Sequence, residues 1–507
     1  KSCYGYIKRR LPILSWAKDY KFTWLAQDAL AGLTVGLTAI PQGIAYAIVA
    51  NLSPEYGLYA SFMASFVYIV FGSCKSITIG PTAIMATMVQ PLVSKYGPDM
   101  AILLSFLKGC MIAILGLLHL GFLLDFISLP VITGFTAAAS INIAASQIKP
   151  LLGIPGRSED LVDALISVFS NLNAIRYEDT LLGVATIIVL VLLKKIKDEL
   201  SDVNLPGRRT GSWPQKITWA ITLARNALVV IIGTVIAYIF YTNNKEPFKL
   251  TGSMGNGLPQ IGLSHFSISD GNRTYDFLET TAAMGTTLFS VPIVSTIEHM
   301  AIAKAFAMGK SLDATQEMFA LGLCNMFASF VRSMPITGSF TRTAVNHSSG
   351  VKTTLGGLFT GCLVLLASSL LTSTFRFIPK ATLAGVIMCS MYYMLDFKTY
   401  ALIWRAKKID FLLMLITLLF CVFYKLEWGI IIGISTFRPY RNRTGQINES
   451  NLQIEDKVAI RIIPEESITF PAAEYFRANI MQLSEKNSLN VVLDCKNVKR
   501  IDVTVAK

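Results

Sequence analysis

Two segments of the sequence share a pattern that suits the binding of an oxyanion. The first runs from Ile77 to Ala83 and the second from Ser333 to Thr343. Each has an extended stretch, then Gly or Pro beside hydroxyl residues, and then a run of small residues typical of a helix start. A helix start offers free N–H groups and about half a positive elementary charge. Two such starts that face each other would cradle an oxyanion without a full ion pair.

Side chains in these segments add a charge and further hydrogen-bond donors. Arg342 places a permanent positive charge at the second helix start, between long apolar runs of the sequence. A lone charge in such apolar surroundings is costly, which favours a function for it. An alternative is that both breaks only kink packed helices, with Ser and Thr satisfying the freed backbone groups. The hydroxyls available as donors are those of Thr82, Thr337, Ser339 and Thr341.

Two other polar residues interrupt apolar runs. Gln42 brings an uncharged amide to membrane depth, where it serves the anion or bonds to a neighbouring helix. Glu298 is an acid within an apolar span, and intramembrane carboxylates commonly take up protons. A structural salt bridge from Glu298 to Arg342 or Lys304 is the alternative.

Three neighbouring polar residues are expected to have local roles. His299 follows Glu298 directly, and because helix neighbours point about 100° apart we predict no dyad between them. Asp313 and Glu317 lie four positions apart in a turn, where we expect them to cap a helix or pair locally.

The composition places these residues in a membrane protein. The chain has 507 residues, of which 53% are hydrophobic and 15% charged, and its mean hydropathy is +0.52. Soluble domains carry about 25% charged residues. The net charge of +13 comes from short basic clusters beside apolar runs, so it favours cytoplasmic loops over nucleic-acid binding. The eight cysteines show no metal-binding spacing, and we predict no metal and no cofactor.

Apolar runs divide the chain into candidate membrane segments. A spanning helix needs about 20 mostly apolar residues, and several runs are shorter, so our count of about fourteen segments is an estimate. The runs are Ala29–Ala50, Tyr56–Gly72, Thr82–Val93, Ile102–Leu120, Ser128–Ile148, Thr180–Leu193, Arg225–Tyr241, Thr280–Ala305, Phe319–Val331, Thr341–Asn346 with Gly356–Leu371, Lys380–Tyr393, Phe411–Tyr424 and Trp428–Phe437.

The basic clusters orient the chain. Clusters near Arg9, Lys195, Lys310 and Lys407 all favour the cytoplasm, together with both ends of the chain. The loop that contains Asn272-Arg273-Thr274 then lies outside, where we expect Asn272 to carry an N-linked glycan. The alternative is a chance match, since Asn442-Arg443-Thr444 has the same pattern on the cytoplasmic side.

The tail differs from the rest of the chain. Val458–Ile463 and Asn490–Cys495 are strand-like, and Pro471–Lys486 between them is typical of an amphipathic helix. This order predicts a small α/β domain.

Several motifs together resemble one family. They are Ala39–Ala47 (AIPQGIAYA) with Gly57–Ala60 (GLYA), Ile297–Phe306 (IEHMAIAKAF) with Gln316–Met318, and Thr337–Thr343 with Gly350–Thr353. The combination resembles the sulfate permeases, the solute carrier 26 family, and is most similar to its sodium-independent sulfate transporter branch. The tail resembles the front part of a STAS domain and ends before that domain would be complete.

The resemblance implies an all-α polytopic membrane protein with two inverted seven-helix repeats, core and gate domains, and a homodimeric assembly. The implied parts are a cytoplasmic segment at 1–28, a transport domain at 29–437 with repeats at about 29–242 and 277–437, and a partial STAS-like α/β domain at 446–507. It implies an anion site between the third and tenth segments. By position, that site would be lined by Gln42, Thr82, Ala83, Ser339, Thr341 and Arg342. Glu298 matches the acid of relatives with proton-coupled uptake.

Function follows as an expectation. Without a phosphate-binding loop or a nucleophile motif, the chain is not expected to be an enzyme. We expect a secondary active, elevator-type transporter of sulfate, driven by a proton or by exchange, in the plasma membrane or alternatively the lysosomal membrane. The alternatives are an uncoupled chloride channel, a chloride, bicarbonate or oxalate exchanger, and a scaffold that has lost transport.

Overall fold

The computed structural model describes most of the helical part of the chain and three strands of the tail. The described residues are 10–119, 129–156, 158, 161–203, 224–252, 259, 261–262, 268–270, 273–306, 312–406, 408–424, 429, 432, 447–454, 457–464 and 490–493. The chain divides into two compact units, Lys1–Leu120 with Ser140–Met394 and Gly121–Ala139 with Leu395–Lys507. All the predicted anion-site residues belong to the first unit.

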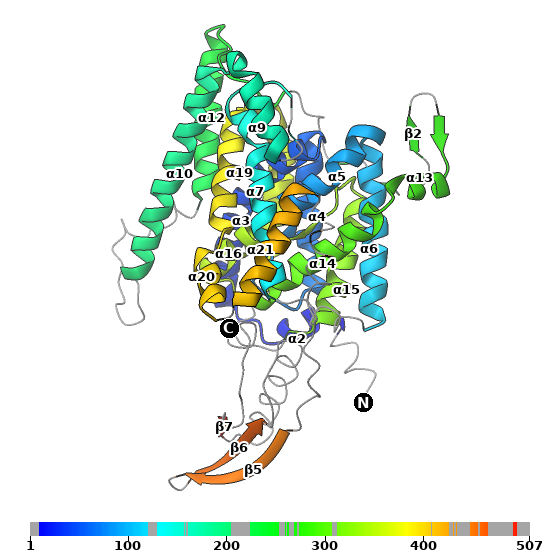
Figure 1. Cartoon of the computed structure of the whole chain (residues 1–507), viewed down its shortest axis with the longest axis vertical. Coiled ribbons are helices and arrows are strands. Elements are labelled where there is room, and N and C mark those ends of the chain that lie inside the picture. Colours follow the sequence, from blue (N-terminus) through cyan, green and yellow to red (C-terminus); the bar gives the residue numbers. More distant parts are fainter. Residues whose placement is uncertain are drawn as a thin grey trace. The chain divides into compact units, whose positions relative to one another are not determined.

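Helices make up nearly all of the described secondary structure before the tail (Figure 1). In the first part of the chain they are α2 (Ile13–Trp16), α3 (Phe22–Val49), α4 (Pro54–Phe71), α5 (Ala83–Tyr96), α6 (Pro98–Leu117), α7 (Leu129–Ser146), α8 (Ile148–Leu151), α9 (Leu161–Ser170), the short 3-10 helix η2 (Leu172–Ala174), α10 (Tyr177–Val203) and α12 (Arg225–Thr242). Then come α13 (Phe277–Met284), α14 (Thr287–Phe306), α15 (Ala314–Ser329), α16 (Phe340–Ser348), α17 (Gly356–Leu370), α18 (Thr372–Phe375), α19 (Lys380–Met394), α20 (Phe397–Ala406) and α21 (Lys408–Phe423).

Several described helices are long and apolar enough to cross a bilayer. They are Phe22–Val49, Pro98–Leu117, Pro130–Leu151 and Arg225–Thr242. The run predicted at Thr280–Ala305 is instead two helices, α13 and α14, which meet at an angle of 60°. Gly285 at the break has a φ of 55°, a conformation that glycine adopts without strain. The count of about fourteen segments remains a prediction.

Two short strands mark the predicted breaks. β1 (Ile79–Gly80) precedes α5 and β4 (Thr337–Gly338) precedes α16, and they pair antiparallel, with Ile79 opposite Gly338 and Gly80 opposite Thr337. The two interrupted segments, more than 250 positions apart in the sequence, are therefore adjacent in the fold.

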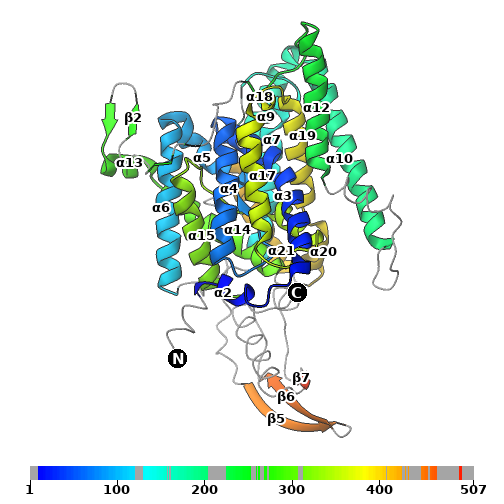
Figure 2. The same ribbon diagram turned by 180° about the vertical axis from the view of Figure 1, so that it is seen from behind.

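The β1–β4 pair is called the crossing below. Small residues allow the helices around it to approach closely. A Cβ atom on Gly57 of α4 would collide with the carbonyl oxygen of Gly43 on α3. A Cβ atom on Gly109 of α6 would lie 2.8 Å from the carbonyl oxygen of Gly322 on α15. Helix pairs in membranes pack through such small residues. Figure 2 shows α4, α15 and α6 side by side, with α17 and α3 next to α4.

Asp28 of α3 holds the loop that follows α16. Its carboxylate accepts hydrogen bonds from the backbone N–H of Lys352 at 2.7 Å and of Thr353 at 3.1 Å, and from the Thr353 hydroxyl at 2.7 Å. Asp28 is fully buried. This contact fixes the end of α16 relative to α3, which carries Gln42.

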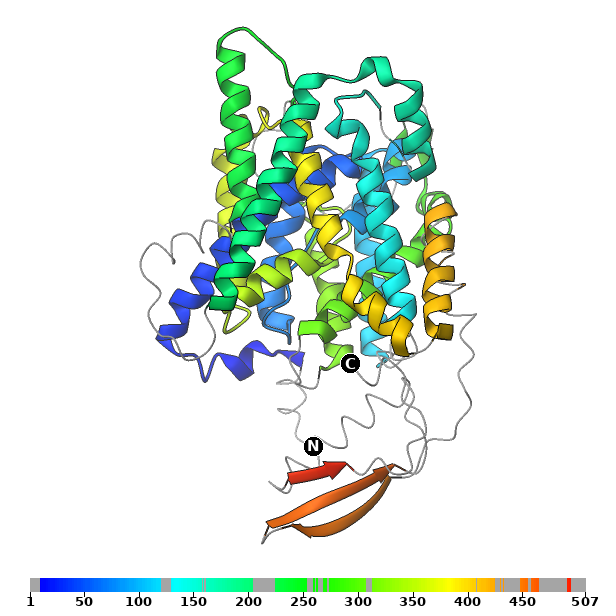
Figure 3. The same ribbon diagram turned by 60° about the vertical axis from the view of Figure 1, so that its left-hand side comes forward.

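The described strands of the tail form one sheet (Figure 3). β5 (Ile447–Ile454) and β6 (Lys457–Pro464) pair antiparallel, and β6 pairs parallel with β7 (Asn490–Leu493). β6 and β7 coincide with the two predicted strands, whereas β5 was not predicted. A parallel pair needs a crossover connection, for which the sequence predicts the helix Pro471–Lys486. That helix and the run Trp428–Phe437 lie outside the continuously described residues.

Candidate functional site

The starts of α5 and α16 meet at the β1–β4 crossing. The residue before α5 is Thr82, whose hydroxyl accepts a hydrogen bond from the Met85 N–H at 3.4 Å. Ser339 holds the equivalent position before α16, and its N–H donates to the Thr78 carbonyl at 3.0 Å. The Thr78 N–H in turn donates to the Thr343 hydroxyl at 3.2 Å. These contacts hold the two helix starts next to each other.

Arg342 reaches across this crossing from α16. Its Nη2 donates to the Pro81 carbonyl at 2.9 Å, although the side chain is only 1% exposed. Its Nη1 is buried and has no hydrogen-bond partner among the described residues. One side of the guanidinium is therefore anchored on the first break, while the other retains donors for an anion.

Gln42 connects α3 to the start of α16. Its Nε2 lies 3.4 Å from the Thr341 hydroxyl, and its Oε1 has no partner among the described residues. The hydroxyls of Ser339 and Thr341 are themselves 3.4 Å apart. These contacts bring three predicted side chains together, and at 3.4 Å they engage the amide and hydroxyl protons only weakly.

Two further predicted residues have different surroundings. Ala83 is buried at the first position of α5, beside the N-terminal backbone groups of that helix. The Thr337 hydroxyl donates to the Ser295 carbonyl of α14 at 2.8 Å. The proton of that hydroxyl is therefore already engaged in holding β4 against α14.

Glu298 lies on α14, facing the same crossing. It is 7% exposed, it interacts electrostatically with Lys108 and Arg342, and it reaches the Thr82 hydroxyl. Its Oε2 has no hydrogen-bond partner among the described residues, and no ion pair joins it to Arg342 there. The carboxylate is thus near two cations without being locked to either.

Three residues that the sequence reasoning did not single out belong to this region. Lys108 of α6 is fully buried, and its Nζ donates to the Ile336 carbonyl at 2.5 Å. Asn325 of α15 binds the same residue twice, at 3.0 Å to its carbonyl and 3.0 Å to its N–H. Tyr46, one turn after Gln42, interacts electrostatically with Arg342 and Glu298. The sequence did contain a signal for Lys108, which is a lone Lys within the apolar run Ile102–Leu120. Charged residues inside membrane segments commonly mark functional positions.

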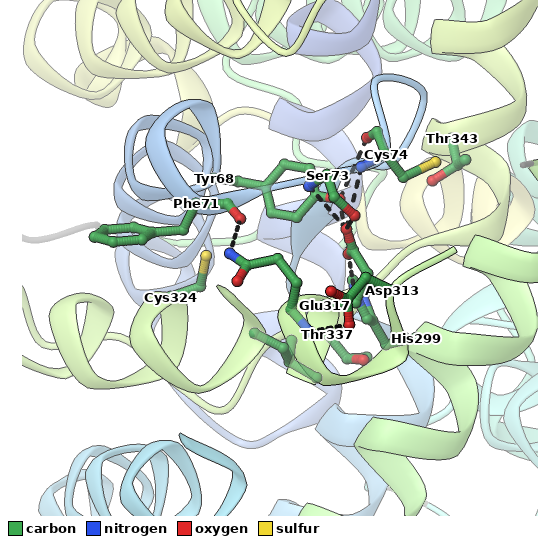
Figure 4. A network of polar contacts seen from close by, with 12 residues as sticks. Tyr68, Phe71, Ser73, Cys74, His299, Asp313, Glu317, Cys324, Thr337 and Thr343 are labelled. Carbon is green, nitrogen blue, oxygen red and sulfur yellow. Dashed lines mark hydrogen bonds and ion pairs between the residues drawn. The ribbon is translucent and has the colours of Figure 1, made fainter. Parts of the chain in front are cut away.

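A second buried network surrounds Glu317 (Figure 4). Its carboxylate accepts from Tyr68 Oη at 2.8 Å, from the N–H groups of Ser73 at 2.8 Å and Cys74 at 3.1 Å, and from Ser73 Oγ at 2.5 Å. His299 Nε2 lies 2.9 Å from it. The expectation of a local role is therefore wrong for Glu317, because helix packing brings α4 and α14 against it. Asp313 does cap α15, by accepting from the Gln316 N–H at 3.2 Å.

His299 joins this network to the crossing. It pairs with Glu317 rather than with its chain neighbour Glu298, which agrees with the prediction of no dyad between the neighbours. Its Nδ1 lies 2.9 Å from where a Cβ on Gly338 would stand, so it faces β4 directly. Glycine at this position lets the imidazole pack against the strand.

The remaining predicted sites concern a glycan and metals. Asn272 lies outside the described residues, between β2 (Ile268–Asp270) and β3 (Arg273–Tyr275), which pair antiparallel. Within the described part of the chain, no group of three His, Cys, Asp or Glu side chains is arranged to hold a metal ion.

Comparisons with known proteins were made on the sequence and on the fold. Residues 25–417 match the model of the sulfate permease family. A sodium-independent sulfate anion transporter of Bos taurus is 40% identical over 98% of this chain and 83% of its own length. A probable sulfate transporter 4.2 of Arabidopsis thaliana is 33% identical, and sulfate permease 1 of Saccharomyces cerevisiae 32%. Both matches cover 85% of this chain, which spans 61% of the plant protein and 52% of the yeast one.

Solved structures share the fold at lower identity. The murine solute carrier 26 family member A9 anion transporter, in its inward-facing state, matches with a TM-score of 0.73 at 22% identity, over 100% of this chain and 86% of that one. The transmembrane domain of a cyanobacterium bicarbonate transporter matches with a TM-score of 0.62 at 19% identity, over 82% and 98%. The chain therefore belongs to the sulfate permease family and is an integral membrane anion transporter rather than an enzyme.

Proposed function

We propose that this chain is a secondary active transporter that carries sulfate across the membrane. The observation that carries the proposal is the buried Nη1 of Arg342, which lies where two helix starts meet and has no hydrogen-bond partner among the described residues. Helix N-termini and a guanidinium are the groups that proteins use to hold tetrahedral oxyanions. The bovine, plant and yeast relatives, which are named as sulfate transporters or permeases, support sulfate as the substrate.

Each residue has a defined role in this proposal. Arg342 supplies the charge, and the N-terminal N–H groups of α5 and α16, beginning at Ala83 and Phe340, supply backbone donors. Thr337 keeps the second break closed against α14. The remaining hydrogen bonds come from the side chains of Gln42, Thr82, Ser339 and Thr341. The first, third and fourth of these are held only by contacts of 3.4 Å. The Thr82 hydroxyl accepts its bond from the backbone, so that bond does not use its proton.

Glu298 couples transport to protons in the same proposal. Sulfate carries two negative charges into a buried region, and an ionised carboxylate beside it would repel it. Protonation of Glu298 removes that repulsion, so a proton and sulfate bind together. Uptake should therefore rise as the pH on the entry side falls.

The movement and assembly follow the family resemblance. We propose an elevator motion, in which a core domain carries the ion past a gate domain, and a homodimer in the plasma membrane. Exchange against a second anion is compatible with the same site, because a monovalent anion can bind when Glu298 is ionised.

Radiolabelled sulfate uptake into proteoliposomes tests the proposal. Wild-type protein is measured with and without an inward proton gradient, beside Glu298→Gln and the control Glu246→Gln, which removes an exposed carboxylate. We expect the gradient to stimulate wild type and Glu246→Gln alike. Glu298→Gln should retain uptake but lose the stimulation, since its side chain is always neutral.

The other outcomes separate the alternatives. Stimulation that persists in Glu298→Gln would remove the coupling role of that residue. Uptake that ignores the gradient but requires internal chloride would favour exchange. No sulfate uptake, together with chloride flux that follows the Nernst potential, would replace the proposal with an uncoupled chloride channel.

A further inference from the structure

Lys108 is a buried basic residue for which the proposed mechanism has no role so far. It lies in the middle of α6 with no solvent exposure. Its Nζ donates to the Ile336 carbonyl at 2.5 Å and lies 3.7 Å from Met85 Sδ. An ammonium carries three N–H donors, and within the described part of the chain no ion pair joins it to a carboxylate. A buried Lys without a close counter-ion is costly, so its position calls for a partner that is present during function.

The two contacts place this charge between the two halves of the anion site. Met85 is in the first turn of α5, and Ile336 is the residue directly before β4. Asn325 completes the grip on Ile336 by bonding to both of its backbone groups. The elements concerned, α5, α6, α14 and α15, lie next to one another (Figure 1). Lys108 therefore contacts the first turn of α5 and the residue before β4, the strand that leads into α16.

The charged groups at the crossing come from several elements. Glu298 on α14 interacts electrostatically with both Lys108 and Arg342, and Tyr46 on α3 and the hydroxyl of Thr82 also face it. His299 and Glu317 form their own pair behind β4. In the proposed cycle, the groups whose charge changes are therefore Glu298 and the anion, and both lie beside the basic side chains of Lys108 and Arg342.

We propose that Lys108 sets the valence of the anion that the site accepts at each protonation state of Glu298. This inference rests on the proposed function. With Glu298 protonated, the two cations balance a divalent anion such as sulfate. With Glu298 ionised, one positive charge remains, which balances a monovalent anion. A buried site with a low dielectric constant favours those combinations of bound anion and proton that leave the site without net charge.

The charge balance has a consequence for exchange. Sulfate entering with one proton carries one net negative charge, and a chloride leaving alone carries the same. Exchange of the two is therefore electroneutral, although the anions differ in valence. Without Lys108, Arg342 alone would balance a monovalent anion with protonated Glu298, and no state would balance sulfate.

Lys108→Gln tests this assignment in proteoliposomes, with sulfate and chloride fluxes measured at several pH values. We expect sulfate uptake to fall on the order of 100-fold, because a buried charge partner is lost. Chloride flux should persist and become stimulated by acid. The double variant Lys108→Gln with Glu298→Gln should keep chloride flux and lose that stimulation. Lys108→Arg, which restores the charge, should recover sulfate uptake relative to Lys108→Gln.

A measurement on the wild type covers the case in which Lys108→Gln does not fold. Size-exclusion chromatography shows whether the variant is monodisperse. Sulfate-for-chloride exchange is then measured under imposed potassium diffusion potentials, with valinomycin. We expect the wild-type rate to be independent of potential and the Glu298→Gln rate to depend on it.

The outcomes separate this inference from the proposed function. If Lys108→Gln takes up sulfate at the wild-type rate and with the wild-type pH dependence, the role of Lys108 is overturned and the proposed function is not. A wild-type exchange rate that changes steeply with potential would have the same consequence. Absence of sulfate uptake in the wild type would instead contradict the proposed function.

Discussion

At the scale of single residues, the anion site depends on how the guanidinium of Arg342 is shared between two tasks. One side holds the Pro81 carbonyl at 2.9 Å, and the other has no partner among the described residues. The ammonium of a Lys is a compact point charge without the planar fork of a guanidinium. It would not hold the Pro81 carbonyl and present donors to an anion in one plane. The close approach requires a glycine opposite, since a Cβ on Gly80 would stand 2.9 Å from Nη2.

Gly80→Ala is expected to weaken anion binding without unfolding the protein. The added methyl meets the far end of a flexible side chain, which can move aside and carry the guanidinium out of place. We expect the KM for sulfate to rise roughly tenfold, the value of one charge-assisted hydrogen bond. The concentration dependence of sulfate uptake measures this.

The matched control is Gly262→Ala, because a Cβ there would have no described atom within 4 Å. Its KM and its yield of monodisperse protein should equal those of the wild type. A Gly80→Ala variant with wild-type KM would show that Arg342 does not hold the anion through this geometry.

At the scale of secondary-structure elements, the crossing is supported from behind by one carboxylate. Glu317 of α15 receives donors from α4, from the loop that follows it and from α14. The loop leads directly into β1, and α14 carries Glu298. Hydrogen bonds to a buried charge are strong, and leaving one donor unpaired there costs more than the bond itself contributes.

Glu317→Gln is therefore expected to be a stability variant. The amide cannot accept all the donors that the carboxylate accepts, and the charge opposite His299 is lost. We expect a loss of about 1–3 kcal/mol for each donor that is left unpaired. The thermal midpoint of the purified protein in detergent, followed by size-exclusion chromatography, measures it.

Glu246→Gln is the control here as well, since its side chain is exposed. An unchanged thermal midpoint in Glu317→Gln would mean that the network of Figure 4 contributes no stability. A lower midpoint with normal uptake at low temperature would confine Glu317 to a supporting role.

At the scale of the whole molecule, orientation in the membrane is the property that the sequence predicts most directly. The basic clusters place the loop with Asn272 outside and the segment with Asn442 inside. Both positions begin an acceptor sequence for N-glycosylation, so they form a matched pair on opposite sides.

Asn272→Gln should remove the glycan of protein expressed in animal cells, and Asn442→Gln should not. Electrophoretic mobility before and after treatment with peptide N-glycosidase measures this. Only the wild type and Asn442→Gln should shift on treatment. A glycan lost in Asn442→Gln would reverse the predicted orientation.

Local patterns in the sequence determined the class of protein and the position of its breaks. Long apolar runs identify membrane segments, and Gly and Pro beside hydroxyl residues identify interruptions, because both depend on neighbouring positions only. Arg342, Gln42 and Glu298 stood out for the same reason, as polar residues in apolar surroundings. The motifs named the family, which the comparisons confirmed.

Only the tertiary structure decided which partners these residues have. Arg342 bonds to a carbonyl 261 positions away, and Lys108 to one 228 positions away. Glu317, expected to act locally, binds groups more than 240 positions distant. Such contacts follow from the close packing of α3, α4, α6 and α15 through their glycines, with α14 packed against α5, α6 and α15. No local pattern specifies which buried charge faces which backbone group, because that depends on which helices pack against each other in the folded chain.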